Sequence, residues 1–487
     1  MIDVLLTHSY FMHFDPKQAR AMAPYPPLAT LYAASVLRSN GFSVQLFDTM
    51  LRHSEDELRA GLSLHRPKVL AIYDDDFNYL NKMCLTRMRE AALAMTRIAK
   101  EYGVKVIVHG SDASDHFEKY LSNGADAVLV GEGEQTLLEV CEQLLRRPDI
   151  SFDSIPGVVF SLGGTLHHNA KRDINRHLDD LPFPAWDLID HDRYRTAWKT
   201  HHGYFSLNMV TTRGCPFHCN WCAKPIYGQV YNARSPENVV AEILYLRKTL
   251  SPDHIWFADD IFGLRPGWVQ KFSSLMNSNG IRIGFKVQSR ADLLLQDDTV
   301  ESLAAAGCDD VWIGAESGSQ KILDAMEKGI TVKQIYDAHT LLSKHGIRTS
   351  FFLQFGYLGE TAEDIQSTIR MVKELRPHDI GISVSYPLPG TTFFDTVKSE
   401  LGGKRNWADS DDLALMYRST FSPPFYRQLH RYVHKVFRIR QGFQFLAELL
   451  LFRHFPTKKY LRRIAALGWY LPAIAIDRFL LHRLSRE

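Results

Sequence analysis

The chain has 487 residues, which is enough for about two to four domains. Its net charge is only +2, and 45% hydrophobic with 23% charged residues is an ordinary globular composition that excludes disordered, collagen-like and coiled-coil chains. Six cysteines in this length exclude a disulfide-stapled secreted scaffold. The first residues lack the basic segment of a signal peptide, and the longest uncharged apolar stretch near the end, Ile464–Ile476, is too short to span a bilayer. We therefore expect a reduced, cytoplasmic location.

Residues 1–145 alternate short apolar runs with helical patterns. The apolar runs predict five strands: Ile2–Leu6, Ser43–Phe47, Lys68–Tyr73, Lys105–His109 and Ala127–Val130. Periodicity predicts helices at Leu28–Ser39, Glu55–Leu64, Tyr79–Glu101, Ala113–Leu121 and Glu134–Leu145. Strands that alternate with helices predict a doubly wound parallel sheet, whose ligands bind at the carboxyl ends of the strands. Here those ends are His8–Tyr10, Asp74–Phe77, Gly110–Asp112 and Gly131–Glu134.

Residues 146–205 contain four prolines and few helical signals, and they predict a linker with a short hairpin at Gly157–Leu166. A second alternation follows in residues 206–391. Its predicted strands are Asn208–Thr212, His254–Ala258, Ile283–Gln288, Asp310–Ala315, Arg348–Phe355 and Ile380–Ser385. Six strand–helix units predict a partial (β/α)6 barrel, smaller than the eight-unit barrel. The fold class expected is therefore α/β, with residues 392–487 forming a helical, basic C-terminal region.

Three cysteines lie within eight residues, in the sequence Cys215-Pro-Phe-His-Cys219-Asn-Trp-Cys222, directly after the first strand of the second alternation. Thiolates at this spacing can surround one soft metal centre. Three thiolates would leave one iron of a [4Fe–4S] cluster without a protein ligand, and that iron could bind a substrate. The alternative is a four-coordinate zinc knuckle completed by His218, which lies on a turn too short to point inward easily.

The Cys-x3-Cys-x2-Cys spacing, with aromatic Trp221 before the last cysteine, resembles the radical S-adenosylmethionine (SAM) enzymes. Further segments at consecutive strand ends carry the same resemblance: Phe257-Ala-Asp-Asp260, Gln288-Ser-Arg290, Gly314-Ala-Glu-Ser-Gly-Ser319, Phe355–Thr361 and Tyr386–Thr391. The resemblance implies that Cys215, Cys219 and Cys222 hold a [4Fe–4S] cluster. It also implies a SAM site lined by Trp221, Asp259, Asp260, Gln288, Arg290, Glu316 and Ser317. Glu316 and Asp259 would contact the amino group and ribose of SAM, and Arg290 its carboxylate. For any one of these residues the alternative is a salt-bridged strand-end side chain.

The first alternation carries a second resemblance. His109-Gly-Ser-Asp112, Gly124-Ala-Asp126 and Val130-Gly-Glu-Gly-Glu134 resemble the cobalamin-binding domain of B12-dependent radical SAM enzymes, in the branch with anaerobic magnesium-protoporphyrin ester cyclase and the hopanoid methylases. This implies cobalamin contacts for His8, Gly110, Ser111, Asp112, Gly131, Glu132 and Gly133.

The Asp-x-His-x-x-Gly sequence that supplies an axial histidine in other B12 proteins is absent, so we expect no protein imidazole on cobalt. The alternative is a flavodoxin-like scaffold without ligand. We interpret Asp74-Asp75-Asp76 as a solvated loop beneath the corrin, and a cation site is the alternative.

The leading function implied by the resemblance is SAM cleavage to a 5′-deoxyadenosyl radical, followed by C-methylation of an unactivated carbon. One SAM would supply the radical and a second would remethylate cobalamin. Non-methylating ring formation or rearrangement with the same cofactors is the alternative, and a non-catalytic cobalamin or redox sensor is an alternative of another class. We expect a small-molecule substrate and an electron donor such as flavodoxin or ferredoxin.

The C-terminal region is strongly basic. Phe425–Glu487 carries 13 Lys and Arg against 3 Asp and Glu, a net charge of +10 on a body of −8. Leu461–Leu484 predicts helical stretches with one apolar and one basic side, as in helices that lie on anionic membranes. Such contact would fit a lipidic or isoprenoid substrate and a peripheral location at the inner face of the membrane. The alternative is a helical cap on the barrel. No nucleic-acid-reading motif is present, so we expect no nucleic-acid partner.

Overall fold

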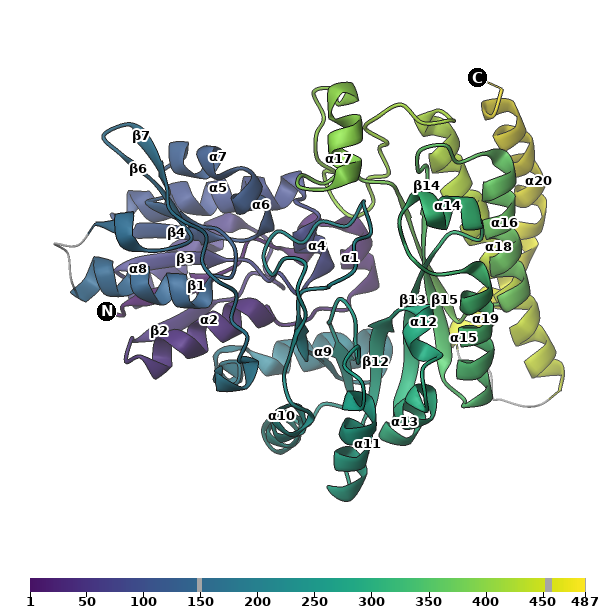
Figure 1. Cartoon of the computed structure of the whole chain (residues 1–487), viewed down its shortest axis with the longest axis horizontal. Helices are drawn as coiled ribbons and strands as arrows, with labels where there is room; N and C mark the ends of the chain where they lie inside the picture. The colour runs from purple at the N-terminus through teal and green to yellow at the C-terminus, as the bar shows by residue number, and fades with distance from the viewer. Residues whose placement is uncertain (147–150, 452–457, 487) are drawn as a thin grey trace.

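The structure is a computed structural model that describes residues 1–146, 151–451 and 458–486. Two α/β bodies lie side by side, and helices from the end of the chain form an outer layer on the second body (Figure 1). One continuous cluster of buried apolar residues extends from the first sheet across the interface to the second sheet. The two bodies are therefore packed against each other over a shared core.

A seven-stranded sheet, in the order β2-β1-β3-β4-β5-β6-β7, forms the N-terminal body. Its parallel strands are β1 (Val4–Thr7), β2 (Val44–Phe47), β3 (Val69–Tyr73), β4 (Lys105–His109) and β5 (Ala127–Leu129). Its helices are α1 (Pro16–Ala21), α2 (Leu28–Ser39), α3 (Leu58–His65), α4 (Tyr79–Lys82), α5 (Thr86–Glu101), α6 (Ser111–Asp115), α7 (Phe117–Ser122) and α8 (Glu134–Arg146). Alternate strand residues face opposite sides, so one face packs on α2 and α8 and the other on α3, α5 and α7. The predicted doubly wound sheet is confirmed.

Residues of the predicted linker extend this sheet. β6 (Val158–Leu162) pairs antiparallel with β5, and β7 (Thr165–His168) pairs with β6, so the predicted hairpin exists but belongs to the N-terminal body. The linker also contains α9 (His191–His202), which the sequence did not predict. Only Tyr194 and Trp198 of α9 are buried, and two apolar anchors in a His-rich segment give a weak periodic signal.

The helix predicted over Tyr79–Glu101 is interrupted. α4 ends at Lys82, α5 begins at Thr86, and Cys84 between them has a left-handed backbone with φ 52°. Such a conformation is uncommon for a residue other than glycine and leaves no trace in the periodicity. The break lets α4 end at the second body, where Lys82 makes a contact described below.

A six-stranded parallel sheet, in the order β15-β14-β13-β12-β11-β8, forms the second body and confirms the predicted partial barrel. Its strands are β8 (Ser206–Met209), β11 (His254–Phe257), β12 (Gly284–Ser289), β13 (Cys308–Glu316), β14 (Arg348–Phe355) and β15 (Asp379–Val384). The helices between them are α10 (Pro236–Thr249), α11 (Trp268–Ser278), α12 (Ala291–Leu294), α13 (Thr299–Ala306), α14 (Gln320–Ala325), α15 (Val332–Lys344) and α16 (Ala362–Leu375). A short antiparallel pair, β9 (Thr212–Arg213) and β10 (Asn232–Ala233), frames the segment with the three cysteines.

The end of the chain returns to both bodies. After α17 (Thr392–Val397), residues 401–422 form an irregular segment, here called the strap, that crosses to the N-terminal body. There Thr86 donates its N–H to the carbonyl of Trp407 at 2.8 Å, and the Ser410 hydroxyl donates to Asp15 at 2.8 Å. The strap is an exception to the helical pattern expected after residue 391.

Three helices follow the strap: α18 (Pro423–Leu450), α19 (Lys458–Ala465) and α20 (Leu467–Leu484). α18 packs on α16 and β15 and buries Tyr426, Leu429, Val433 and Phe437, so this helix is the expected cap on the barrel. α19 and α20 pack on α18. Among the helices of the described residues, none has the length and apolar character needed to cross a bilayer.

Asp74, Asp75 and Asp76 are buried, so the interpretation of this triplet as a solvated loop was wrong. Each carboxylate accepts a backbone N–H from a different segment: Asp74 from Ser9 at 2.7 Å, Asp75 from Ala29 at 3.0 Å and Asp76 from Ser111 at 3.1 Å. The triplet therefore ties the end of β1, the start of α2 and the end of β4 together at one edge of the sheet. Burial raises the pKa of Asp76 to about 7.

Replacing Asp76 with Asn should change how stability depends on pH. A carboxyl whose pKa is raised to about 7 in the fold contributes stability below its unfolded pKa of about 4 and loses it as pH rises toward 7. Asp76→Asn removes that loss. Its free energy of unfolding, measured by denaturant titration, should therefore rise relative to wild type between pH 5 and pH 7, by up to about 1.4 kcal/mol per pH unit.

Asp364→Asn is the matched control, because hydrogen bonds from Ser319 and Thr361 outweigh burial and lower the pKa of Asp364 to about 2. Its difference from wild type should stay flat over the same range. A flat difference for Asp76→Asn as well would contradict the assignment of a raised pKa to Asp76.

Candidate functional site

The segment 214–231, here called the cysteine loop, lies at the carboxyl ends of the barrel strands, between β9 and β10. Gly214 begins it with φ 80°, and a Cβ at this position would lie 2.3 Å from the carbonyl oxygen of Val230, so a larger residue does not fit. Asn220 anchors the middle of the loop. Its side-chain amide donates to the carbonyl of Ala325 at 2.8 Å, and the Tyr357 hydroxyl donates to its Oδ1 at 2.7 Å. These bonds fix the loop over the end of the barrel.

The three thiols of the loop influence one another electrostatically. Cys215 is buried, and Cys219 and Cys222 are half-buried. Burial, with Asp260 and the two other thiols nearby, raises the pKa of Cys222 to about 12. A positively charged metal centre is what would favour the thiolate form in this environment.

The type and number of ligating side chains decide which metal centre fits the cysteine loop. Among the residues that the structure describes, no three His, Cys, Asp or Glu side chains are close enough to share a single metal ion. Three thiols on one loop suit, by type and number, a multi-iron centre that keeps one iron for another ligand. Phe217, Ile261, Leu264 and Leu293 pack around Cys215 and make this side of the loop apolar.

A buried ion pair lies at the end of β13. Glu316, at φ 55° where the register of β13 shifts against β14, accepts a hydrogen bond from Lys328 Nζ at 2.8 Å. Arg290 donates to the carbonyl of Lys328 at 2.8 Å, and its guanidinium lies 3.7 Å from the centre of the Phe217 ring in the cysteine loop. Glu316 and Arg290 thus meet around Lys328. Sequence reasoning missed Lys328, because nothing in the sequence separates a buried lysine from a surface one.

Asp259 and Asp260 follow β11 and make different contacts. Asp259 is buried, and its carboxylate accepts four hydrogen bonds of 2.7–3.0 Å from the backbone and hydroxyls of Thr211 and Thr212. It therefore holds the turn that precedes the cysteine loop. Asp260 accepts from Lys82 Nζ, which comes from α4 of the N-terminal body. Burial lowers the pKa of Lys82, but Asp260 and Cys222 outweigh burial and raise that pKa. The Lys82–Asp260 contact joins the two bodies.

The three other residues predicted for SAM surround the same end of the barrel. The indole Nε1 of Trp221 is buried and has no hydrogen-bond partner among the described residues. Gln288 is half-buried on β12. Ser317 is buried, and its hydroxyl accepts from the N–H of Ser319 at 3.1 Å, which shapes the turn after β13. Contact of these side chains with SAM stays a prediction.

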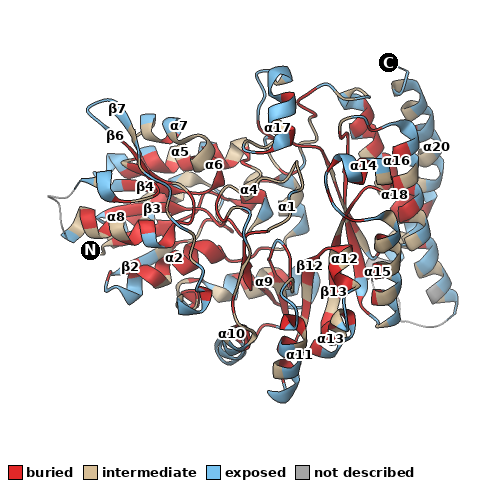
Figure 2. Cartoon of the chain, in the orientation of Figure 1, coloured by how far each residue is buried: buried red, intermediate tan, exposed pale blue. Residues whose placement is uncertain are grey.

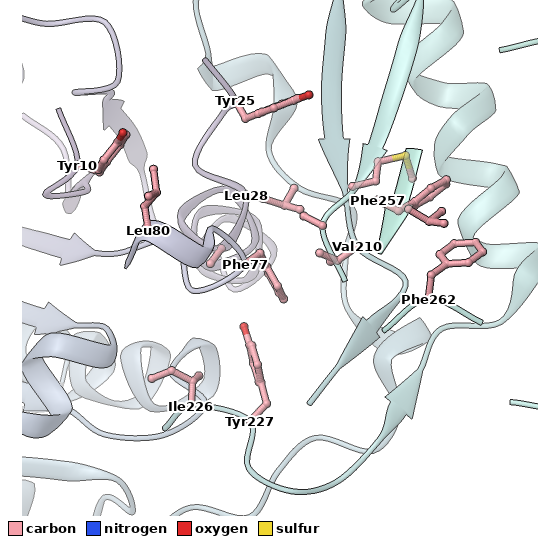
Figure 3. Packing of buried hydrophobic residues seen from close by; sticks show 14 of the residues in the cluster. Tyr10, Tyr25, Leu28, Phe77, Leu80, Val210, Ile226, Tyr227, Phe257 and Phe262 are labelled. Carbon is pink, nitrogen blue, oxygen red and sulfur yellow. The ribbon is translucent and has the colours of Figure 1, made fainter. Parts of the chain in front are cut away.

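Arg213 joins the two bodies. It lies on β9 directly before the cysteine loop, is 3% exposed, and donates to Glu134 at 2.7 Å and to Glu132 in the loop after β5. Its guanidinium lies 5.2–5.7 Å from the ring centres of Tyr32, Phe77 and Tyr227. Figure 3 shows Phe77 and Tyr227 between the bodies, and their rings stack at 5.4 Å. Glu132, predicted to contact cobalamin, is engaged by an arginine that sequence reasoning missed.

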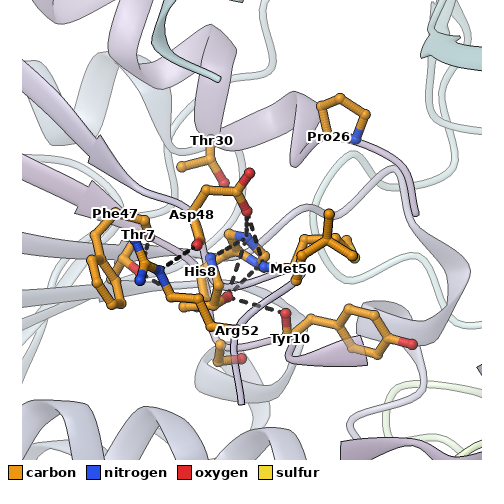
Figure 4. Close-up of polar contacts among 12 residues, drawn as sticks. Thr7, His8, Tyr10, Pro26, Thr30, Phe47, Asp48, Met50 and Arg52 are labelled. Atoms are coloured by element: carbon orange, nitrogen blue, oxygen red, sulfur yellow. Dashed lines mark hydrogen bonds and ion pairs between the residues drawn. The ribbon is translucent and has the colours of Figure 1, made fainter. Parts of the chain in front are cut away.

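All residues predicted to contact cobalamin lie at the carboxyl edge of the first sheet. His8 is buried, its Nε2 lies 3.0 Å from Asp48 Oδ1, and its Nδ1 lies 3.1 Å from the Thr49 hydroxyl (Figure 4). Both ring nitrogens of His8 are thus occupied by neighbours in the N-terminal body, and the absence of a protein imidazole on cobalt stays a prediction. Asp112 is engaged as well, by Arg89 and by the Tyr120 hydroxyl at 2.6 Å.

The glycines at this edge leave little space for side chains. A Cβ at Gly133 would lie 2.5 Å from the His109 ring. His109 Nε2 in turn lies 2.9 Å from the carbonyl oxygen of Gly131. Gly110 follows β4 and Ser111 begins α6, where the Ser111 hydroxyl donates to Asp76 at 2.9 Å. Whether these residues contact a corrin stays a prediction.

Buried polar atoms test whether this edge suits cobalamin. Tyr10 Oη and both side-chain amide atoms of Asn81 have no partner among the described residues, and Asp76 Oδ2 and His109 Nδ1 face each other at 3.5 Å without a hydrogen bond. They follow or end β1, β3 and β4, next to the point where the strand order reverses between β1 and β3. Unpaired buried polar atoms are costly, so this edge fits a ligand rich in amide groups, as the corrin periphery is.

Several known proteins are similar to this chain in sequence. The profile of the radical SAM superfamily matches residues 209–372. A methyltransferase of Pyrococcus horikoshii, itself uncharacterized, is 26% identical over 388 residues, 78% of this chain and 81% of that protein. The anaerobic magnesium-protoporphyrin IX monomethyl ester cyclase of Rubrivivax gelatinosus is 25% identical over 78% of this chain and 67% of its own length. The hopanoid C-3 methylase of Methylococcus capsulatus is 27% identical over 77% and 69%.

The second body therefore contains a radical SAM domain, over residues 209–372. The resemblance to the branch with the cyclase and the hopanoid methylase is confirmed, and it reaches beyond the radical SAM barrel. Among solved structures, the radical SAM methyltransferase TsrM from Kitasatospora setae, with cobalamin and a [4Fe–4S] cluster bound, has a TM-score of 0.65 at 18% identity over 81% of this chain and 74% of that one. At this identity the match establishes a shared fold over 81% of this chain.

Replacing Lys82 with Met should weaken SAM binding by about tenfold, equivalent to about 1.4 kcal/mol. The physical reason is that Asp260, which the resemblance places in the SAM site, would lose the ammonium group that holds its carboxylate in position. Equilibrium dialysis with labelled SAM measures the effect. Lys82→Arg should keep wild-type affinity, and Lys333→Met, which removes an exposed ion pair with Asp337, is the control. Unchanged affinity for SAM in Lys82→Met would contradict the assignment of Asp260 to the SAM site.

Proposed function

We propose that the protein is a cobalamin-dependent radical SAM enzyme that methylates an unactivated carbon of a small molecule. One observation carries the proposal: the cysteine loop and the carboxyl edge of the first sheet face each other across an interface that Arg213 and Lys82 close. A cluster on the loop and a corrin on the edge would then share one space. The methyltransferase names of the Pyrococcus and Methylococcus relatives favour methyl transfer.

The motif resemblance and the contacts described above support the following assignment of residues. Cys215, Cys219 and Cys222 hold the [4Fe–4S] cluster, and residues 206–391 form its barrel. Residues 1–145, extended by the β6–β7 hairpin, hold cobalamin. When bound, these cofactors supply reductive cleavage of SAM and delivery of a methyl group. The chain itself places Lys328 beside Glu316, holds Asp260 with Lys82, and surrounds Cys215 with apolar side chains that exclude water.

Ring formation or rearrangement without methyl transfer is the second candidate, favoured by the similarity to the cyclase. Product analysis separates the two. With reductant, SAM and an organic extract of host cells as the substrate source, methyl transfer gives S-adenosylhomocysteine together with 5′-deoxyadenosine. Ring chemistry gives 5′-deoxyadenosine alone. Neither product would indicate the non-catalytic sensor, which has no need of a SAM site.

The variant with Cys215, Cys219 and Cys222 all replaced by Ala should bind no cluster after anaerobic reconstitution, because all three protein ligands are removed. Iron and sulfide analysis with absorption spectroscopy measures this, and wild type should bind about four of each. Cys308→Ala is the matched control, since Cys308 is a buried cysteine on β13. Native iron and sulfide content with an unchanged spectrum in the triple variant would contradict the assignment.

The reconstituted protein should retain cobalamin without a protein nitrogen on cobalt, because the sequence lacks the Asp-x-His-x-x-Gly motif and both nitrogens of His8 have partners inside the N-terminal body. Electron paramagnetic resonance of the Co(II) form should therefore show no superhyperfine splitting from a protein ligand. Splitting that disappears in His8→Ala would contradict this expectation. Failure to retain any corrin would contradict the cobalamin assignment as a whole.

The substrate and location remain part of the proposal. We propose a lipidic or isoprenoid substrate, reached in the cytoplasm at the inner face of the membrane, and a flavodoxin- or ferredoxin-type electron donor. The similarity to a protein named as a hopanoid methylase supports a lipid-like substrate, and the net charge of +10 on Phe425–Glu487 supports contact with an anionic surface.

A further inference from the structure

α20 has an apolar face that no other described part of the chain covers. The helix packs on α18 with one side, where Asp477 is buried against Gln428 at 2.8 Å and Lys435 at 2.7 Å. The opposite side is on the outer surface of the molecule (Figure 2). Its apolar residues follow helical spacing: Trp469, Pro472, Ile476 and Phe479.

The exposure of this face is large. Trp469 is 73% exposed, Ile476 61% and Phe479 68%, in a helix whose other side is already apolar and packed. The expected division into one apolar and one basic side is therefore wrong for α20, which is apolar on both sides for most of its length. A helix that is apolar all round is normally buried all round, so its outer face calls for a partner.

The charge around the face identifies the chemistry of the partner. From Leu449 to Arg486 the sequence contains eight Lys and Arg and one acidic residue, and that residue is the buried Asp477. Arg478, Arg483 and Arg486 are exposed on and just after α20, and Arg462 on α19. An apolar strip bordered by arginines, with a tryptophan near one end, is the pattern of a helix that lies in the surface of an anionic bilayer.

Other partners fit less well. A second copy of this chain would bring two segments of net charge +10 together, which is repulsive. Nucleic acid offers negative charge but no apolar surface to cover Ile476 and Phe479. Only a lipid surface supplies both an apolar interior and anionic headgroups.

We propose that the outward face of α20 docks the protein on an anionic membrane surface, with Trp469, Ile476 and Phe479 entering the headgroup boundary and the neighbouring arginines contacting lipid phosphates. The outward face of α20 would then be the surface by which the protein contacts the membrane, at the location given in the proposed function. It does not depend on cluster or cobalamin chemistry.

The test is flotation of the full-length protein with vesicles of phosphatidylglycerol and phosphatidylcholine, or of phosphatidylcholine alone. Wild type should bind the anionic vesicles at least tenfold more tightly than the neutral ones, and salt should weaken the binding. Trp469→Ser/Ile476→Ser/Phe479→Ser should lose at least tenfold in affinity for anionic vesicles. The variant Arg462→Gln/Arg478→Gln/Arg486→Gln should lose most of the salt-sensitive part of the affinity for anionic vesicles.

Leu64→Ser is the control, because Leu64 is an equally exposed apolar residue, at 76%, on the N-terminal body. Circular dichroism and thermal unfolding establish that each variant is folded. Binding that is negligible, equal for both vesicles, or retained by the triple-serine variant would overturn the proposal. A dimer of wild type that dissociates in the triple-serine variant would also overturn it, in favour of a second copy.

Formation of 5′-deoxyadenosine from SAM in detergent-free buffer keeps this test separate from the proposed function. The triple-serine variant should form it at the wild-type rate, because its substitutions lie on the outer surface. Lost membrane binding with intact SAM cleavage supports the docking surface. Absent SAM cleavage in wild type would contradict the proposed function and leave the membrane result standing.

Discussion

The structure depends on one buried cation, Arg213. A guanidinium at 3% exposure costs several kcal/mol unless its partners are in place, and both partners, Glu132 and Glu134, come from the other body. Neither body alone satisfies its half of this contact. Because Gly214 and Cys215 follow Arg213 directly, the same ion pair sets where the cysteine loop begins relative to the edge of the first sheet.

The candidate site is accordingly divided between the bodies. Lys82 from the N-terminal body meets Asp260 of the barrel, and Phe77 stacks on Tyr227 of the cysteine loop. Within the barrel, Arg290 links the loop to Lys328 and so to Glu316. A change in how the bodies pack would therefore disturb the Lys82–Asp260 and Phe77–Tyr227 contacts and leave those within the barrel intact.

Features set by neighbouring residues could be predicted from the sequence, whereas contacts between distant residues could not. β4 and β14 were predicted to the residue, because apolar runs bounded by turn signals define strands locally. The cysteines were found because their ligand spacing lies within one loop. The break at Cys84 was not, since a left-handed backbone leaves no periodic signal. Lys82, Arg213 and Lys328 were missed because their partners lie 178, 81 and 12 residues away and only the fold brings each pair together.

The strap is synthesised long after the residues of the N-terminal body that it contacts. Ser410 completes the hydrogen bonding of Asp15, 395 residues earlier, and Asn406 accepts from Arg89 at 3.0 Å. During synthesis at about 5–20 residues per second, the ribosome would release Asp15 roughly 20–80 s before Ser410. Until most of the chain has emerged, the N-terminal body therefore lacks the hydrogen bonds that the strap makes to Asp15 and Arg89. Nascent chains of this protein should need protection longest at the end that is made first.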